Sequence, residues 1–402
     1  MSFTSSRNVG TRDVRISAIA KAVSLLGDRA ALLALTLRMA ASGHSWQVGA
    51  VLIAGMLPLV VCAPLAGRWA DRIDYRRLLV PAAAVQALCC LALAAAHGTV
   101  ATLLLVFALG AAEAVTSAGW SALLPRLAAD GDLTKAYALS QTYTSVAVIA
   151  APALGGALTA LGGTGLPLLL DAATFVVLGL VVFAVRPNPA AKTPEGAAGA
   201  GGAIAVLRAD STMAVAISGL AVMLLVICAV NVVEVFLIRS TLHAGPGWYG
   251  AVGAAWGLGV TIGAVLVGRL KSDAALPAVL VGGIGMIAAA LVIVGVLPSV
   301  GWLLAPMVLG GIGNGALNVS ATALTIGRAP AHVRGRVGAL VNAVFAAAQL
   351  VAFTIGGVLG GLLSPRTLFV AGGLLGVLVA AVMAMLLLRR RAAEDRLVAT
   401  AG

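Results

Sequence analysis

The chain has 402 residues, of which 61% are hydrophobic and 10% are charged, whereas a soluble chain carries about 25% charged residues. This composition excludes a soluble enzyme, a disordered protein and a disulfide-stapled secreted module, and it indicates a polytopic membrane protein. The net charge of +12 does not indicate nucleic-acid binding, because the basic residues lie in short clusters between apolar runs.

Twelve apolar runs are long enough to cross a bilayer, which needs about 20 residues. They predict spans over 14–40, 46–67, 77–97, 99–125, 136–162, 165–185, 212–240, 247–268, 275–297, 299–326, 333–363 and 366–388. The runs are continuous, whereas the strands of a membrane barrel would alternate polar and apolar residues. The sequence therefore predicts an all-α membrane protein with twelve transmembrane helices.

The placement of Lys and Arg predicts the orientation of these spans. If both termini are cytoplasmic, 21 of the 26 basic residues fall in inside segments and only Arg239 and Arg366 fall outside. Lys21, Arg29 and Arg38 lie within the first span. We expect a multi-pass protein of the bacterial inner membrane with both termini in the cytoplasm.

The longest non-apolar stretch, 186–211, is rich in Pro, Gly and Ala and is typical of a flexible cytoplasmic linker. It separates a six-helix N-terminal half, 1–185, from a six-helix C-terminal half, 212–388, which a cytoplasmic tail, 389–402, follows. A repeat at an offset of 201 residues aligns Gly67-Arg68 with Gly268-Arg269, Gly110 with Gly311, and Gly155-Gly156 with Gly356-Gly357. Two parallel six-helix repeats are an architecture of alternating-access transporters.

The loop after the second span reads Gly67-Arg-Trp-Ala-Asp71-Arg72-Ile-Asp74-Tyr-Arg76-Arg77-Leu-Leu79. It resembles the signature loop of the major facilitator superfamily, which it matches at Gly67, Ala70, Asp71, Arg72, Arg76 and Leu79 and leaves at Trp69, Asp74 and Tyr75. The resemblance implies a cytoplasmic gate in which Asp71 and its arginines latch the two halves together, with an acceptor near His332 to Arg336. A plain positive-inside loop would explain the arginines but not the Asp four residues after Gly.

Span 136–162 contains Ala147-x-x-x-Ala151-Pro152-Ala-Leu-Gly155-Gly156, which resembles the antiporter signature of the same superfamily. Pro152 kinks a helix, and Gly155 and Gly156 allow close helix packing. The resemblance implies export rather than uptake; an ordinary Pro-kinked helix is the alternative.

Stretches at 24–28, 124–126, 171–175 and 333–337 resemble the enterobactin-exporter and multidrug-exporter branch of the superfamily. The stretch before Gly110, Leu105 to Leu109, lacks the Arg that many drug:proton antiporters carry there.

Inserting an acidic side chain into the bilayer within a span costs at least about 2.5 kcal/mol of free energy. Each such residue is therefore expected to have a structural or functional role. Four lie inside predicted spans: Asp28, Glu113, Asp171 and Glu234. We expect Glu113 to carry a coupling proton, with Asp28 as second and Glu234 as third candidate. A permanent ion pair with a base such as Arg29 is the alternative for Glu113, and an ion pair with Lys21 or Arg29 is the alternative for Asp28. Asp171, near the start of its span, is expected to cap or anchor locally.

The helical period places Glu113 on one face with Thr116, Ser117 and Trp120. Its repeat counterpart, Asn314, shares a face with Asn318. We expect these polar stripes, together with Asn231 one turn before Glu234, to line a substrate cavity. Only one stripe is ionisable, which suits a single proton carrier opposite a neutral partner.

The sequence shows no nucleotide-binding loop, metal-ligand spacing or nucleophile–base arrangement. The four cysteines, Cys62, Cys89, Cys90 and Cys228, lie in apolar runs and are predicted to be buried thiols. We therefore expect no enzyme activity, no cofactor and no metal, and an ion gradient as the driving force.

These observations together predict a monomeric secondary transporter in the lipid bilayer that exports a small amphipathic compound (a drug, natural product or siderophore) in exchange for protons. Two alternatives remain open: a proton-coupled importer of the same fold, and a membrane sensor or assembly protein that has lost transport.

Overall fold

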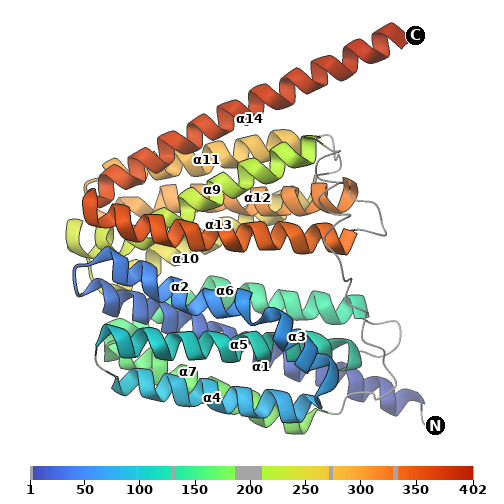
Figure 1. Ribbon diagram of the computed structural model, residues 1–402, viewed down its shortest axis with the longest axis vertical. Helices are drawn as coiled ribbons and strands as arrows, with labels where there is room; N and C mark the ends of the chain where they lie inside the picture. The colour runs from blue at the N-terminus through green and yellow to red at the C-terminus, as the bar shows by residue number, and fades with distance from the viewer. Residues whose placement is uncertain are drawn as a thin grey trace. The chain divides into compact units, whose positions relative to one another are not determined.

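The computed structural model describes residues 3–96, 98–127, 133–185, 211–270, 275–328 and 334–401, and in these ranges the regular structure is helical (Figure 1). The long helices are α1 (Phe3–Ala40), α2 (Ser45–Val61), α3 (Ala63–Arg72), α4 (Tyr75–Ala95), α5 (Thr99–Leu127), α6 (Leu133–Gly162), α7 (Gly165–Ala184), α9 (Ser211–Phe236), α10 (Pro246–Gly268), α11 (Leu276–Val296), α12 (Leu304–Arg328), α13 (Arg334–Leu362) and α14 (Pro365–Ala401). Two short helices, η1 (Leu237–Thr241) and η3 (Val300–Leu303), extend α9 and precede α12. The predicted linker, apart from Ser211, lies outside the described residues.

The predicted all-α membrane fold is confirmed. Among the described residues, ten helices are long and apolar enough to cross a membrane, and the bent pair of α2 and α3 makes an eleventh span. The predicted first span lies in α1, whose 38 residues include the charged side chains Lys21, Asp28, Arg29 and Arg38. Both α1 and α14 extend beyond their predicted spans, 14–40 and 366–388.

The predicted span over 46–67 is formed by two helices with a bend between them. α2 ends at Val61 and α3 begins at Ala63, with a bend of 48° between them. Pro64 lies in the first turn of α3, where it lacks the N–H that a continuous helix would donate to the preceding turn. The chain then continues as helix to Arg72, so the gate loop is shorter than the sequence suggests.

The chain divides into two compact units. Unit 1 holds Met1–Glu195 with Gly245–Ala254, and unit 2 holds Gly196–Ala244 with Ala255–Gly402. In unit 1, α1 packs on α6 and α7, and α4 packs on α5 and α7. In unit 2, α9 packs on α13 and α14, and α11 packs on α12 and α14. The same order of packing in both units matches the repeat found in the sequence.

Glycines at equivalent positions of the two repeats make equivalent close contacts between helices. A Cβ on Gly110 of α5 would lie 2.5 Å from the carbonyl oxygen of Gly55 in α2. A Cβ on Gly311 of α12 would meet the carbonyl oxygen of Trp256 in α10, and residues 55 and 256 are themselves 201 positions apart. Each unit therefore joins the same pair of helices, backbone to backbone, at the same point.

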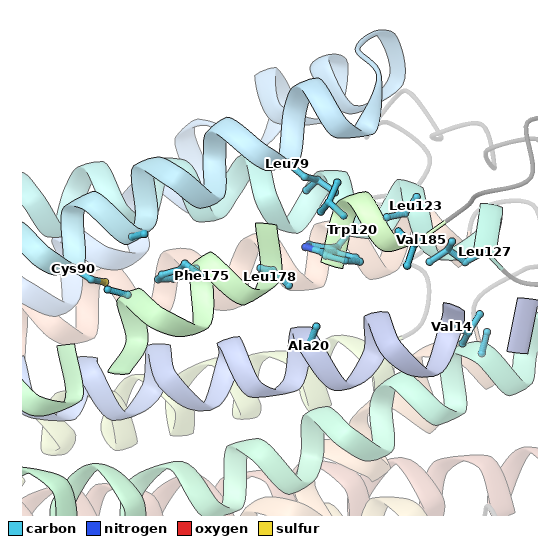
Figure 2. Packing of buried hydrophobic residues seen from close by; sticks show 14 residues of the cluster. Val14, Ala20, Leu79, Cys90, Trp120, Leu123, Leu127, Phe175, Leu178 and Val185 are labelled. Atoms are coloured by element: carbon cyan, nitrogen blue, oxygen red, sulfur yellow. The ribbon is translucent and has the colours of Figure 1, made fainter. Parts of the chain in front are cut away.

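The described core of unit 1 is a cluster of apolar side chains between α1, α4, α5, α6 and α7 (Figure 2). Leu79 of α4, Leu123 of α5 and Phe175 of α7 are all nearly or fully buried within it. The Trp120 ring lies in the same cluster, near Leu79 and Leu178. This core packs α5 together with α4 and α7.

We predict that Gly110→Ala and Gly311→Ala each destabilise the protein, whereas Gly179→Ala does not. The first two add a methyl group where backbone atoms already lie within 3 Å, which typically costs about 1–3 kcal/mol. At Gly179 the nearest atom to an added Cβ is 3.6 Å away, an ordinary contact. Thermal unfolding in detergent measures the difference. Equal stability of all three variants would contradict the shared packing point.

Candidate functional site

The centre of the site is Glu113, halfway along α5. Its Oε2 accepts a hydrogen bond of 2.9 Å from Nε2 of Gln86 on α4. The Gln86 side chain is fully buried, and its Oε1 accepts a hydrogen bond of 2.9 Å from the hydroxyl of Thr116, one turn after Glu113. The carboxylate is therefore held across the α4–α5 contact by a neutral amide.

Three charged side chains of α1 act on Glu113 electrostatically: Lys21, Asp28 and Arg29. Within the described part of the chain, no ion pair closer than 4.0 Å joins the Glu113 carboxylate to Lys21 or Arg29. Lys21 and Asp28 are half-buried, and Arg29 is exposed. These residues set the potential at Glu113, but its hydrogen bond goes to the amide.

Asp171 of α7 is a fully buried carboxylate that joins three helices. Its Oδ2 accepts from the Cys90 thiol of α4 at 3.3 Å, and its Oδ1 accepts from the Thr174 hydroxyl at 3.2 Å. A Cβ on Gly27 of α1 would lie 2.5 Å from the same Oδ1, so α1 approaches this carboxylate closely. Asp171 anchors α7 to α4 and does not cap α7, whose N-cap is Thr164.

The predicted cavity residues of unit 1 differ in their surroundings. Ser117 is half-buried, and the Thr116 hydroxyl donates a hydrogen bond to the Gln86 side chain. Trp120 is only 4% exposed and belongs to the apolar core, where its Nε1 has no hydrogen-bond partner among the described residues. The structure thus places Trp120 in the packing of α5, so we leave it out of the proposed site.

The polar stripe of unit 2 is continuous along α12. Asn318 donates from its amide to the backbone oxygen of Asn314 at 2.8 Å and also to the Asn314 side chain. Thr322 in turn donates to the backbone oxygen of Asn318 at 2.8 Å. Asn318 is exposed and Asn314 is half-buried, so the stripe presents amide groups at its surface.

The remaining acid, Glu234, lies near the end of α9, two residues before this helix changes to the π-helix η1. Its side chain is half-buried, and Asn231 one turn earlier is exposed. Single π-turns occur frequently at functional sites. Arg239 within η1 closes the following turn by donating to the Ala244 carbonyl at 2.7 Å.

The gate motif lies at the α3–α4 junction, where Asp71, Arg72 and Arg76 are exposed. Two departures from the family signature have local roles there. Asp74 is the N-cap of α4 and accepts from the Arg76 N–H at 3.0 Å, and the Arg76 guanidinium lies 5.5 Å from the centre of the Tyr75 ring. The predicted acceptor, His332 to Arg336, lies outside the described side chains.

The antiporter-type motif around Pro152 packs closely against two other helical segments. A Cβ on Gly155 would lie 2.9 Å from Cα of Ala30 in α1, and a Cβ on Gly156 would lie 2.7 Å from Cα of Gly250. Gly250 belongs to the same compact unit as α6. Since Ala30 is two residues from Asp28, this motif fixes the charged stretch of α1 against α6.

Sequence reasoning missed Gln86 and the partnership of Cys90 with Asp171. A signal for Gln86 was present, because it is a lone amide within the apolar run 77–97, and a buried amide needs partners. The prediction of buried thiols holds for Cys89, Cys90 and Cys228, whereas Cys62 is half-buried at the α2–α3 bend.

Comparison with known proteins agrees with this architecture. The family model of the Major Facilitator Superfamily matches residues 18–237 and again residues 215–402. No curated protein is significantly similar to the chain in sequence.

Solved structures share the fold at low sequence identity. The nucleoside transporter NupG superposes with a TM-score of 0.76 at 14% identity, over 93% of this chain and 98% of its own. A bacterial homologue of the human lysosomal transporter Spinster, in an inward-facing and unoccupied conformation, gives a TM-score of 0.72 at 14% identity, over 94% and 96% of the two chains. A POT family transporter in complex with a thioalcohol-conjugated peptide gives 0.69 at 12% identity, over 94% and 95%.

We predict that Cys90→Ala destabilises the protein by about 1 kcal/mol, because the buried Asp171 carboxylate loses a donor. Cys90→Ser restores a donor at the same position and should recover the stability. Cys89→Ala is the matched control, since this neighbouring thiol is also buried but does not bond to Asp171. Detergent thermal-unfolding curves of the three variants test this; a Cys90→Ala variant as stable as Cys89→Ala would refute the anchor.

Proposed function

We propose that this chain, which belongs to the major facilitator superfamily of membrane transporters and is not an enzyme, exports a small amphipathic compound in exchange for protons. The observation that carries the proposal is the surroundings of Glu113: an acid inside the helix bundle whose direct hydrogen-bond partner is the neutral amide of Gln86.

A carboxylate bonded to a neutral amide can gain a proton without leaving a bare charge beside it. A carboxylate locked in an ion pair cannot, because protonation would leave a buried cation unpaired, at a cost of about 3–5 kcal/mol. The surroundings of Glu113 therefore suit a group that alternates between two protonation states. In the repeat, the neutral Asn314 occupies the corresponding position, so this role has no duplicate in unit 2.

Besides Glu113, the proposed transport cycle involves the charged residues of α1. The positive charges of Lys21 and Arg29 and the negative charge of Asp28 interact electrostatically with Glu113. A substrate or a helix movement that changes the distance between α1 and α5 would change this balance and release or bind a proton. Asp28 is the second candidate for the carrier, and Glu234 of unit 2 is the third.

The direction of transport rests on the antiporter-type motif at Pro152, Gly155 and Gly156. Its packing on Ala30 couples α6 to the segment of α1 that carries Asp28 and Arg29. The structural neighbours include transporters named for nucleosides and for peptides, so this fold accommodates substrates of different chemistry. A proton-coupled importer with the same fold is the alternative, and the direction of proton flux on substrate addition separates the two.

The proposed location is the bacterial inner membrane with both termini in the cytoplasm, which rests on the distribution of Lys and Arg. In this orientation the exposed Asp71, Arg72 and Arg76 are on the cytoplasmic side. We propose that the exporter works as a monomer. Its substrate can be identified by measuring drug susceptibility and compound accumulation for a panel of compounds in an efflux-deficient host that expresses the protein.

We predict that Glu113→Gln abolishes uphill transport driven by a pH gradient but preserves substrate binding and exchange, because the amide mimics the protonated acid at nearly the same size. Uptake of the substrate from the panel into everted vesicles, driven by a pH gradient, provides the measurement. A stable Glu113→Gln protein with full gradient-driven transport would remove Glu113 from the mechanism. A fall in stability by about 3–5 kcal/mol would instead indicate a structural ion pair.

A second prediction concerns the gate. Asp71→Asn should insert normally but slow transport, because it removes the anionic side of the cytoplasmic latch. Asp74→Asn removes a charge from the same exposed junction yet keeps the α4 cap, since Asn caps as well as Asp. Initial transport rates at equal membrane levels test this, and wild-type rates in Asp71→Asn would exclude the latch.

A further inference from the structure

Glu113, Gln86 and Thr116 form a chain of hydrogen bonds in which Glu113 is half-buried and the other two are buried. Gln86 is fully buried and Thr116 is 3% exposed. Nε2 of Gln86 lies 2.9 Å from Oε2 of Glu113, and Oγ1 of Thr116 lies 2.9 Å from Oε1 of Gln86. Because Gln86 and Thr116 are buried, the polar atoms of these two side chains need hydrogen-bond partners within the protein.

The Thr116 hydroxyl has two acceptors but only one hydrogen atom. Its Oγ1 lies 2.9 Å from Oε1 of Gln86 and 3.0 Å from the backbone oxygen of Ala112. It can donate to only one of them at a time. Two hydrogen-bond arrangements are therefore possible with the three side chains in place, provided that the Gln86 amide can exchange the positions of its oxygen and nitrogen.

In the first arrangement Glu113 is ionised. The Gln86 amide group donates to the Glu113 carboxylate, and the Thr116 hydroxyl donates to the Gln86 oxygen. In the second arrangement Glu113 is protonated and the Gln86 amide is rotated by half a turn. The Glu113 O–H then donates to the Gln86 oxygen, the Gln86 amide group donates to Thr116, and Thr116 donates to the Ala112 oxygen. The Gln86 amide, the Thr116 hydroxyl and the Glu113 oxygen that faces Gln86 are paired in both arrangements, which differ by one proton on Glu113.

We infer that Gln86 is the positioning residue for the Glu113 proton: its amide turns over when Glu113 gains or loses the proton, with Thr116 switching its hydroxyl between Gln86 and Ala112. This inference rests on the proposed role of Glu113 as proton carrier. The amide side chain keeps the carboxyl group in one place in both states, so that protonation does not cost a buried unpaired group.

The other titratable groups that act on Glu113 lie on α1 and α7. They are Lys21, Asp28 and Arg29 on α1 and Asp171 on α7. The α2 segment, Ser45–Val61, carries no titratable side chain, and the charged residues of α3 are exposed. Gln86 is thus the group of α4 that responds to Glu113 by direct hydrogen bonding.

Infrared difference spectroscopy of the full-length protein in detergent tests the inference without a substrate. A pH titration should show the C=O band of a protonated carboxyl group that is absent in Glu113→Gln. A side-chain amide band should change with the same midpoint and should also be absent in Glu113→Gln. In Gln86→Met, which has similar length but no hydrogen-bonding group, the carboxyl midpoint should move to higher pH by about one unit. The reason is that a bond to a charged acceptor is about twice as strong as one to a neutral acceptor.

Thr116→Val and Thr102→Val provide a matched comparison. Both residues lie on α5, both are buried, and each hydroxyl bonds to the carbonyl four residues earlier. Only Thr116 also reaches Gln86, so Thr116→Val should lower the thermal stability more than Thr102→Val, and Thr116→Ser should restore it.

The possible failures are distinguishable. A Glu113 band that titrates with one midpoint in both wild type and Gln86→Met, or without any accompanying amide change, overturns the role of Gln86 and leaves Glu113 as the carrier. The absence of any titrating Glu113 band overturns the carrier and the inference together. The coincidence of the two bands in the wild type decides the matter even if Gln86→Met fails to fold.

Discussion

Close contact between helix backbones is the constraint on which the rest of this structure depends. Lipid tails are as apolar as leucine, so helices in a bilayer gain little from burying apolar surface and associate where small residues let them approach. Here Gly110 meets Gly55, Gly155 meets Ala30 and Gly356 meets Ala229. These contacts fix the spacing of the helices, and the polar side chains between them then have defined partners.

The repeat reproduces this scaffold but not its chemistry. Gln86, Glu113 and Asp171 of unit 1 correspond, at the offset of 201 residues, to Ile287, Asn314 and Gly372 of unit 2. At Gly372 an added Cβ would lie 3.1 Å from the side chains of Val226 and Val230. Unit 2 therefore has apolar side chains packed at the position where unit 1 has the buried Asp171 carboxylate. The two units share their helix contacts, and the acids of α1, α5 and α7 belong to unit 1 alone.

The sequence predicted the spans well because hydropathy and basic clusters report directly on the bilayer. It predicted less about single side chains. Trp120 lies two turns after Glu113, so the helical period places both on one face of α5. The period cannot say what covers that face, and Leu79 and its neighbours cover it at Trp120. Gln86 was missed for a related reason, since its importance comes from the helix beside it. The bend at Cys62 depends on the exact register of Pro64, which a hydropathy average hides.

The charges around Glu113 give a reason why a single proton belongs to this group of residues. Lys21 and Arg29 supply two positive charges, and Asp28, Glu113 and Asp171 supply three negative charges when all are ionised. The sum of −1 is unfavourable in a low-dielectric interior, and one added proton brings it to zero. Asp171 already accepts from Cys90 and Thr174 on its two oxygens, so an added proton would compete with an existing donor. Glu113 accepts from Gln86 on Oε2, and the amide of Gln86 can reverse its role from donor to acceptor. The hydrogen-bonding chemistry of the partner, more than burial alone, therefore selects Glu113 as the place for the proton.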